Sequence, residues 1–199
     1  MTTIDIILGS SRINAEGHKL FHYLENHASD WVNPGQVTLR FMDIATYQLP
    51  LFNEDESPMD NPHRQLTENE QRWLDDLKQA DGYVILTPEY NHSLPAALKN
   101  GLDYVAYEMQ GKPVRILTYA PSARGGQFAF LALLPTLNQL GCFVLPKPTI
   151  IGRITQNFTV AGEMPIDAPA VARYPERLKR MVREIAFYGQ LFVEHPFEG

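Results

Sequence analysis

The sequence predicts an α/β protein in which a five-stranded parallel sheet is covered by helices on both faces. Short segments rich in β-branched residues alternate with helix-like segments, and parallel strands need such helical crossovers. The strand segments also lack the strict alternation of apolar and polar residues that a half-exposed sheet shows, so they are expected to be buried on both faces. Five strands joined in this way favour the flavodoxin-like strand order 2-1-3-4-5.

The elements are expected in the following order. Strands are predicted at residues 4–8, 37–42, 83–86 and 114–119. Helices are predicted at residues 18–28, 63–80, 94–106, 126–140 and 175–193. A fifth strand is expected within 142–151, where Pro146 and Pro148 either confine it to a sheet edge or split it. No linker or repeat divides the chain, so residues 1–199 are expected to form a single domain.

Two helices have recognisable starts. The last one has apolar residues at the three- and four-residue spacing of one helical face, namely Leu178, Met181, Val182, Ile185, Tyr188, Leu191 and Phe192. Pro175 suits its first turn, where the missing N–H is not needed. Ser93 is expected to cap the helix at 94–106, with Pro95 in the first turn of that helix.

Composition narrows the classes of function. The 199 residues include 17 basic and 23 acidic side chains, and the net charge of −6 disfavours binding to nucleic acid. The basic stretch 173–183 is interpreted as a solvated helix face. The longest apolar run, 128–134, is too short to cross a membrane, and the amino terminus lacks the basic region of a secretory signal, so a cytoplasmic location is expected. The single cysteine, Cys142, is expected in the core.

In an open parallel sheet ligands bind beyond the carboxyl ends of the strands, so the loops that follow the strands are informative. The first loop, 8–18, reads LGSSRINAEGH. Its glycines, its hydroxyls, the start of a helix and Arg12 make up a cradle for phosphate. The other interpretation is a glycine-containing turn with a surface arginine. Glu16 disfavours the cradle unless its carboxylate turns away from the phosphate.

Two further loops hold candidate ligand contacts. The third strand leads into Pro88-Glu89-Tyr90-Asn91, where a planar aromatic ligand could meet backbone groups, although Tyr90 and Asn91 also suit packing and turn roles. The fourth strand leads into Ser122-Ala123-Arg124-Gly125-Gly126, whose glycines permit close approach of a ligand or an ordinary turn. A hydrolase using Ser93 or Ser122 with a histidine such as His92 is disfavoured, because no G-x-S-x-G elbow occurs.

Together these loops resemble the NADPH-dependent FMN reductase family, which has a flavodoxin-like fold and includes quinone, chromate and azo-dye reductases. The likeness covers most of the chain, in the correct order. It is carried by Gly9-Ser10-Ser11-Arg12, Leu49-Pro50-Leu51-Phe52-Asn53-Glu54-Asp55, Pro88-Glu89-Tyr90-Asn91 with Leu98-Lys99-Asn100, and Gly125-Gly126 with Ala129. The Pro-Glu-Tyr-Asn run leading to Leu-Lys-Asn is the most specific of these motifs.

The resemblance implies a non-covalent FMN that is reduced by NADPH or NADH and reoxidised by a small, quinone-like electron acceptor. Around the phosphate it places Ser10, Arg12, Gly17 and His18. Around the ring and ribityl chain it places Pro88, Glu89, Tyr90 and Asn91, and at the pyrimidine end Ser122, Arg124, Gly125 and Gly126. No catalytic acid, base or nucleophile and no metal is expected, because the flavin itself accepts the hydride.

Four further features of the protein are left open by the sequence. A flavodoxin-like electron carrier would bind FMN without reacting with a nicotinamide nucleotide. The acidic segment 53–60 is either a solvated loop or a wall over the flavin. The apolar residues of the helix at 94–106 exceed what one sheet face needs, which together with the resemblance predicts a homodimer or a dimer of dimers. For the 2′-phosphate of NADPH the candidates are Arg12, Arg64 and Arg124.

Overall fold

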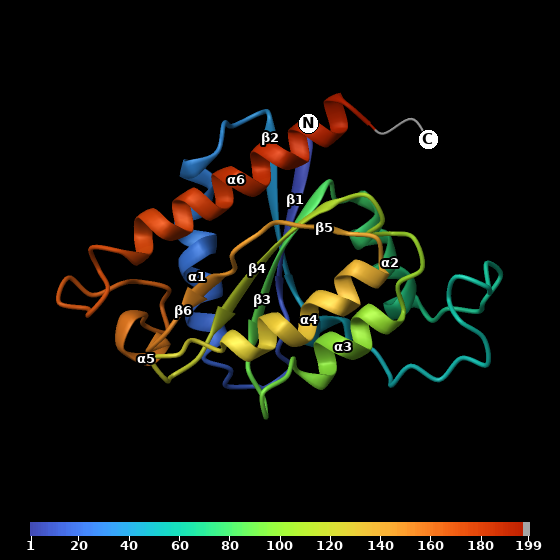
Figure 1. Cartoon of the computed structure of the whole chain (residues 1–199), viewed down its shortest axis with the longest axis horizontal. Coiled ribbons are helices and arrows are strands. Elements are labelled where there is room, and N and C mark those ends of the chain that lie inside the picture. The colour runs from blue at the N-terminus through green and yellow to red at the C-terminus, as the bar shows by residue number, and fades with distance from the viewer. Residues whose placement is uncertain (197–199) are drawn as a thin grey trace.

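A computed structural model describes residues 1–196 and has the predicted architecture (Figure 1). The parallel sheet consists of β1 (Thr2–Leu8), β2 (Val37–Asp43), β3 (Gly82–Pro88), β4 (Pro113–Tyr119), β5 (Phe143–Val144) and β6 (Thr149–Ile151). Its order, β2-β1-β3-β4-β5 with β6 also paired to β4, confirms the flavodoxin-like topology. The carboxyl ends of β1, β3 and β4 therefore meet at one edge of the sheet.

The predicted fifth strand is split into β5 and β6. Both pieces pair in parallel with β4, Phe143 beside Pro113 and Ile150 beside Thr118. Pro146 and Pro148 lie between the two pieces and have no N–H to contribute to a ladder. Lys147, between the prolines, has the left-handed φ of 62°. The backbone therefore leaves the sheet for a few residues and then returns to it.

Helices cover both faces of the sheet. They are α1 (Gly17–His27), α2 (Glu68–Gln79), α3 (Ala96–Asp103), α4 (Gln127–Gln139), the short α5 (Ile154–Asn157) and α6 (Tyr174–Glu194), with 3-10 turns η1 (Ala28–Trp31) and η2 (Ile44–Tyr47). In Figure 1, α1 and α6 lie on one face, and α2, α3 and α4 lie on the other. None of the helices within residues 1–196 is both long and apolar enough to span a membrane.

Two predicted helix starts were wrong. The helix expected at 63–80 begins at Glu68, because Thr67 and Glu70 form a capping box in which each side chain accepts from the other residue's backbone N–H. The helix expected at 94–106 runs only over Ala96–Asp103, and its N-cap is Pro95 rather than Ser93. Ser93 instead pairs with Tyr90 across a tight turn.

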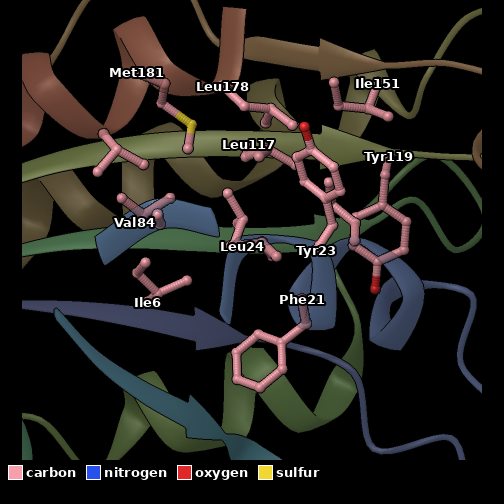
Figure 2. Close-up of a cluster of buried hydrophobic side chains, with 14 of the residues drawn as sticks. Ile6, Phe21, Tyr23, Leu24, Val84, Leu117, Tyr119, Ile151, Leu178 and Met181 are labelled. Atoms are coloured by element: carbon pink, nitrogen blue, oxygen red, sulfur yellow. The ribbon is translucent and has the colours of Figure 1, made fainter. Parts of the chain in front are cut away.

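Apolar side chains form one core layer on each face of the sheet. Figure 2 shows the layer against α1 and α6, where Leu24 and Met181 pack over Val84 and Leu117 of the central strands. The layer on the other face contains Cys142, which confirms that the cysteine is a core residue. Burial raises the pKa of the Cys142 thiol to about 12, so it stays protonated.

Candidate cofactor site

The β1–α1 loop opens onto an uncapped helix end. No side chain caps α1, and its first turn has no acidic residue. The amide N–H groups of Ser11, Ile13 and Asn14 have no acceptor among residues 1–196. Free N–H groups at the start of a helix, together with the helix dipole, attract an anion. The exposed guanidinium of Arg12 lies beside them and adds a positive charge.

The first and third predicted loops meet at Ser10. Ser10 is fully buried, and its hydroxyl lies 3.0 Å from the hydroxyl of Tyr90. The Arg12 guanidinium lies 5.9 Å from the centre of the Tyr90 ring, within reach of a cation–π contact. The structure therefore brings Tyr90 to Ser10 and Arg12, although Tyr90 lies 80 residues after Ser10 in the sequence.

Gly17 begins α1 at a position where no side chain fits. A Cβ atom on this residue would lie 2.1 Å from the hydroxyl oxygen of Tyr119. Tyr119 is 2% exposed, and its hydroxyl has no partner among the described residues. Burial raises the pKa of Tyr119, so the hydroxyl keeps its proton. A glycine is therefore required wherever this ring packs against the start of α1.

His18 and Glu16 already have partners within the protein. His18 places Nε2 3.1 Å from the carboxylate of Asp43 and Nδ1 3.2 Å from the carbonyl of Ala15. Its contact with a phosphate therefore stays a prediction. The Glu16 carboxylate lies 2.7 Å from Lys19 Nζ, which offsets the repulsion that it would otherwise exert on an anion.

Asp43 was missed by the sequence reasoning. It ends β2, next to β1 in the sheet, so its carboxylate reaches the same edge as the phosphate loop. The available signal was its position: the last residue of a strand is a candidate whenever the neighbouring strand ends in a ligand-binding loop.

The loop after β3 forms a tight hairpin turn. Tyr90 and Ser93 exchange two backbone hydrogen bonds of 3.0 Å each. Between them Asn91 and His92 both have left-handed φ values, 49° and 61°. Two such residues in a two-residue loop are typical of a type I′ turn. This turn leaves the side chains of Asn91 and His92 exposed beyond the sheet edge.

The third and fourth loops meet through Glu89. Its carboxylate accepts a hydrogen bond of 2.8 Å from the N–H of Phe128, in the first turn of α4. The His92 ring stacks on the Phe128 ring with centroids 4.4 Å apart. The Glu89 side chain, predicted as a flavin contact, is thus engaged with the neighbouring loop. Its backbone remains beside the predicted ring site, next to Pro88.

The loop before α4 has the left-handed backbone conformation that glycine permits. Gly125 and Gly126 have left-handed φ values of 64° and 76°. A Cβ atom on Gly126 would lie 2.9 Å from the carbonyl oxygen of Tyr119. The side chains of Ser122 and Arg124 are exposed, while the Ser122 carbonyl accepts from the N–H of Arg153. The far end of this loop therefore rests on the segment after β6.

The Leu98-Lys99-Asn100 motif holds two neighbouring segments in place. Leu98 packs so closely on Gly9 that a Cβ there would lie 2.9 Å from it. The Asn100 amide donates to the carbonyl of Pro50 over 2.7 Å and accepts from the N–H of Phe52 over 2.8 Å. The motif on α3 therefore fixes both the phosphate loop and the Leu-Pro-Leu-Phe run after β2.

The acidic segment 53–60 lies along α3 and α4. Pro58 and Met59 line a groove of about 440 Å³ with Leu102 of α3 and Pro135 of α4. Its contacts are therefore with the outer helices, and the solvated-loop interpretation suits it better than a wall over the site. Among residues 1–196 no serine hydroxyl bonds to a histidine ring and no cluster of side chains could hold a metal ion.

The comparisons with known proteins decide the family. The model of the NADPH-dependent FMN reductase family matches residues 2–156. The chain belongs to this family. The Pseudomonas putida quinone reductase is 29% identical over 169 residues, which are 81% of this chain and 84% of that protein. The NADPH azoreductase of a Bacillus species is 31% identical over 154 residues, 76% and 78% of the two chains.

A solved structure shows the same fold. It is the flavoenzyme NAD(P)H:(acceptor) oxidoreductase FerB from Paracoccus denitrificans, with a TM-score of 0.74 and 22% sequence identity. The match covers 96% of this chain and 98% of that chain.

The described residues of this family member fit an FMN. The free amides of the β1–α1 loop and Arg12 suit a phosphate dianion. The backbone of the hairpin at 90–93 and of Gly125 and Gly126 suits the polar edge of a planar ring, and the two glycines have no Cβ that would block its approach.

Proposed function

We propose that this protein is an FMN-dependent NAD(P)H oxidoreductase that reduces a quinone-like or other small electron acceptor. The convergence of three loops supports this most strongly. The Ser10–Tyr90 contact joins the first loop to the third, and the Glu89–Phe128 contact joins the third to the fourth. A single ligand with a phosphate at one end and a flat polar ring at the other would touch all three.

The roles of the residues follow from their positions. The free amides before α1, with Ser10 and Arg12, would hold the phosphate; Gly17 lets α1 start close to it, and His18 stays a candidate contact. Residues 88–91 would border the ring. The N–H groups of Gly125 and Gly126 would face the pyrimidine end, where donors stabilise the negative charge of reduction.

The chemistry that a bound FMN would supply is acceptance of a hydride from the nicotinamide and transfer of two electrons to the second substrate. The chain's task is to hold the flavin with one ring face open. Because the nicotinamide and the acceptor would use that face in turn, ping-pong kinetics are expected. No side chain is assigned as acid, base or nucleophile.

The visible absorption spectrum is the first test. Purified protein that is yellow, or that becomes yellow with micromolar FMN, supports the proposal, and protein that remains colourless with added FMN contradicts it. Mixing with NADPH without oxygen then separates the enzyme from an electron carrier. Bleaching of the flavin within seconds supports the enzyme, whereas an unchanged spectrum supports the carrier. The modest net charge of −6 favours the enzyme, since carriers gain from strongly acidic docking faces.

The preference between NADPH and NADH depends on a cation for the 2′-phosphate. Arg64 is engaged elsewhere, because it lies 3.4 Å from the carboxylate of Glu54 and donates to the carbonyl of Tyr104. Arg12 and Arg124 remain exposed at the site. Arg124→Ala tests whether Arg124 binds the 2′-phosphate. A rise in KM for NADPH, with KM for NADH unchanged, would assign that role to Arg124.

We also propose a homodimer or a dimer of dimers built on α3 and α4. The apolar residues of the helix predicted at 94–106 give less support for a dimer than the sequence suggested, because Leu98, Leu102 and Val105 are buried within the monomer. Two large apolar side chains remain exposed nearby: Tyr107, in the loop after α3, is 59% exposed, and Leu131 on α4 is 58% exposed. Sedimentation that shows only a 22.6 kDa species would contradict the dimer. Use of a nicotinamide nucleotide favours the cytoplasm as the compartment.

A further inference from the structure

Helix α4 lacks a cap of its own. Its N-cap residue is Gly126, which has no side chain to accept from the free N–H groups of the first turn, and that turn contains no acidic residue. Free N–H groups at a helix start carry a partial positive charge, and an unpaired buried one costs free energy. Another part of the chain must supply the acceptor.

Glu89 supplies it from the neighbouring loop. The Glu89 carboxylate accepts from the N–H of Phe128 over 2.8 Å, across a separation of 39 residues. Its side chain is 17% exposed, so the contact is largely shielded from water. A Cβ on Gly126 would lie 3.3 Å from the Glu89 Cβ, which shows how closely the two loops approach. The His92–Phe128 stack reinforces the same junction.

The contact between Glu89 and Phe128 lies beside the proposed flavin site, where a nearby charge would affect reduction of the flavin. Pro88 to Asn91 would border the flavin ring, and Gly125 and Gly126 would meet the end of the ring that becomes negative on reduction. The start of α4 would favour that negative charge, whereas the Glu89 carboxylate opposes it. The same side chain therefore joins the two loops and offsets part of the helix dipole.

We infer that Glu89 is a positioning residue that caps α4 from the adjacent loop and, through its negative charge, holds the reduction potential of the bound FMN down. This inference rests on the proposed function and specifies how the site is tuned. A lower potential favours transfer of electrons out of the flavin to the acceptor. It also limits how far the nicotinamide nucleotide drives the flavin to its reduced form.

Two variants separate the cap from the charge. Glu89→Gln keeps an oxygen that accepts from Phe128 but removes the charge, and Glu89→Ala removes both. Glu176→Gln is the matched control, because it removes an exposed glutamate from the first turn of α6, on the other face of the sheet. For each holoenzyme, the midpoint potential, the dissociation constants of oxidised and reduced FMN, and Tm are measured.

For Glu89→Gln we expect the affinity for reduced FMN to rise about three- to tenfold relative to oxidised FMN. Tenfold corresponds to a positive shift of about 30 mV for a two-electron couple. Its Tm should remain near that of the wild type. Glu89→Ala should bind both forms more weakly and melt lower, and Glu176→Gln should match the wild-type potential.

The outcomes distinguish the two proposals. Wild-type protein that binds FMN, together with a Glu89→Gln variant of unchanged potential, overturns this inference and leaves the proposed function standing. A Glu89→Gln variant as unstable as Glu89→Ala also overturns it, because the amide would then fail as a cap. Wild-type protein that binds no FMN overturns both.

Discussion

The phosphate loop depends on two small residues near the start of α1, Gly17 and Ser10. Gly17 is the clearest case, because the Tyr119 ring occupies the space that any side chain there would need. Ser10, fully buried, bonds the first loop to the third through Tyr90. At this scale the site depends on a small residue and a buried hydroxyl, and neither residue needs reactive chemistry of its own.

The first prediction concerns Gly17→Ala. The added methyl group would force α1 or Tyr119 to move. We therefore expect the free energy of unfolding to fall by about 1–3 kcal/mol, as at other overpacked sites. We also expect weaker FMN binding, because the free amides before α1 would shift. Chemical denaturation and fluorescence titration with FMN measure the two effects.

Gly111→Ala is the control for this prediction. Gly111 has a φ of 74° with no atom within 4 Å of a built Cβ, so alanine there strains the backbone by about 1–2 kcal/mol without touching the site. FMN affinity should then stay at the wild-type value. If Gly17→Ala binds FMN as tightly as the wild type, the close packing of α1 has no role in the phosphate loop.

At the scale of whole elements, the Asn100 side chain joins α3 to the segment after β2. Asn100 both donates to Pro50 and accepts from Phe52, so a helix and an extended segment are joined by two hydrogen bonds.

We therefore predict that Asn100→Ala lowers the free energy of unfolding by about 1–3 kcal/mol, the range expected for two hydrogen bonds. Asn100→Asp retains the acceptor for Phe52 but places a carboxylate oxygen against the carbonyl oxygen of Pro50, so its loss should be at least as large. Urea denaturation gives both values. Equal stability of Asn100→Ala and the wild type would show that the Leu-Pro-Leu-Phe run is held by other contacts.

The elements also show what could be predicted from the sequence. The strands were located because their segments are rich in residues that favour strands and mostly lack strict alternation, and Pro146 and Pro148 left a split of the fifth strand as one of two expected outcomes. The start of α2 was misplaced because the capping box at Thr67 and Glu70 was not recognised. Ser93 was misassigned because the left-handed turn at 91–92 pairs it with Tyr90 instead.

The site was only partly predictable, for a physical reason. Loops that follow neighbouring strands must meet, so Ser10, Arg12 and Tyr90 could be grouped from topology alone. Contacts such as Glu89 to Phe128 and His18 to Asp43 depend on side-chain directions in loops. Those directions are set by tertiary packing, which leaves no periodic signal in the sequence.

On the scale of the whole molecule, a partly buried ionic network joins β1, β2 and α2 midway along the two strands. The Arg40 guanidinium on β2 lies 2.8 and 2.9 Å from the two carboxylate oxygens of Asp5 on β1. It also contacts the Asp76 carboxylate on α2 at 2.8 Å, and Tyr47 donates to the same carboxylate. Because Asp5 is fully buried, its ionisation is coupled to global unfolding.

That coupling predicts how stability depends on pH. Burial raises the pKa of Asp5 from 3.8 to about 6, although the hydrogen bonds from Arg40 act to lower it. Between these two values the folded protein holds a proton that the unfolded chain has released. The free energy of unfolding contributed by Asp5 therefore falls as the pH rises through this window, by on the order of 3 kcal/mol, and is constant above it.

Asp5→Asn removes this titration, so the stability of the wild type relative to this variant should be greatest near the low-pH end of the window and decline toward pH 6. Urea denaturation across the window measures the difference, and Asp55→Asn, an exposed loop substitution, should leave the wild-type pH dependence unchanged. The competing possibility is that the bidentate Arg40 outweighs burial and keeps Asp5 ionised at low pH. In that case the relative stability of the wild type would be constant between pH 3.8 and about 6 and would fall only as the pH drops below 3.8, and a flat profile over the window would overturn the prediction.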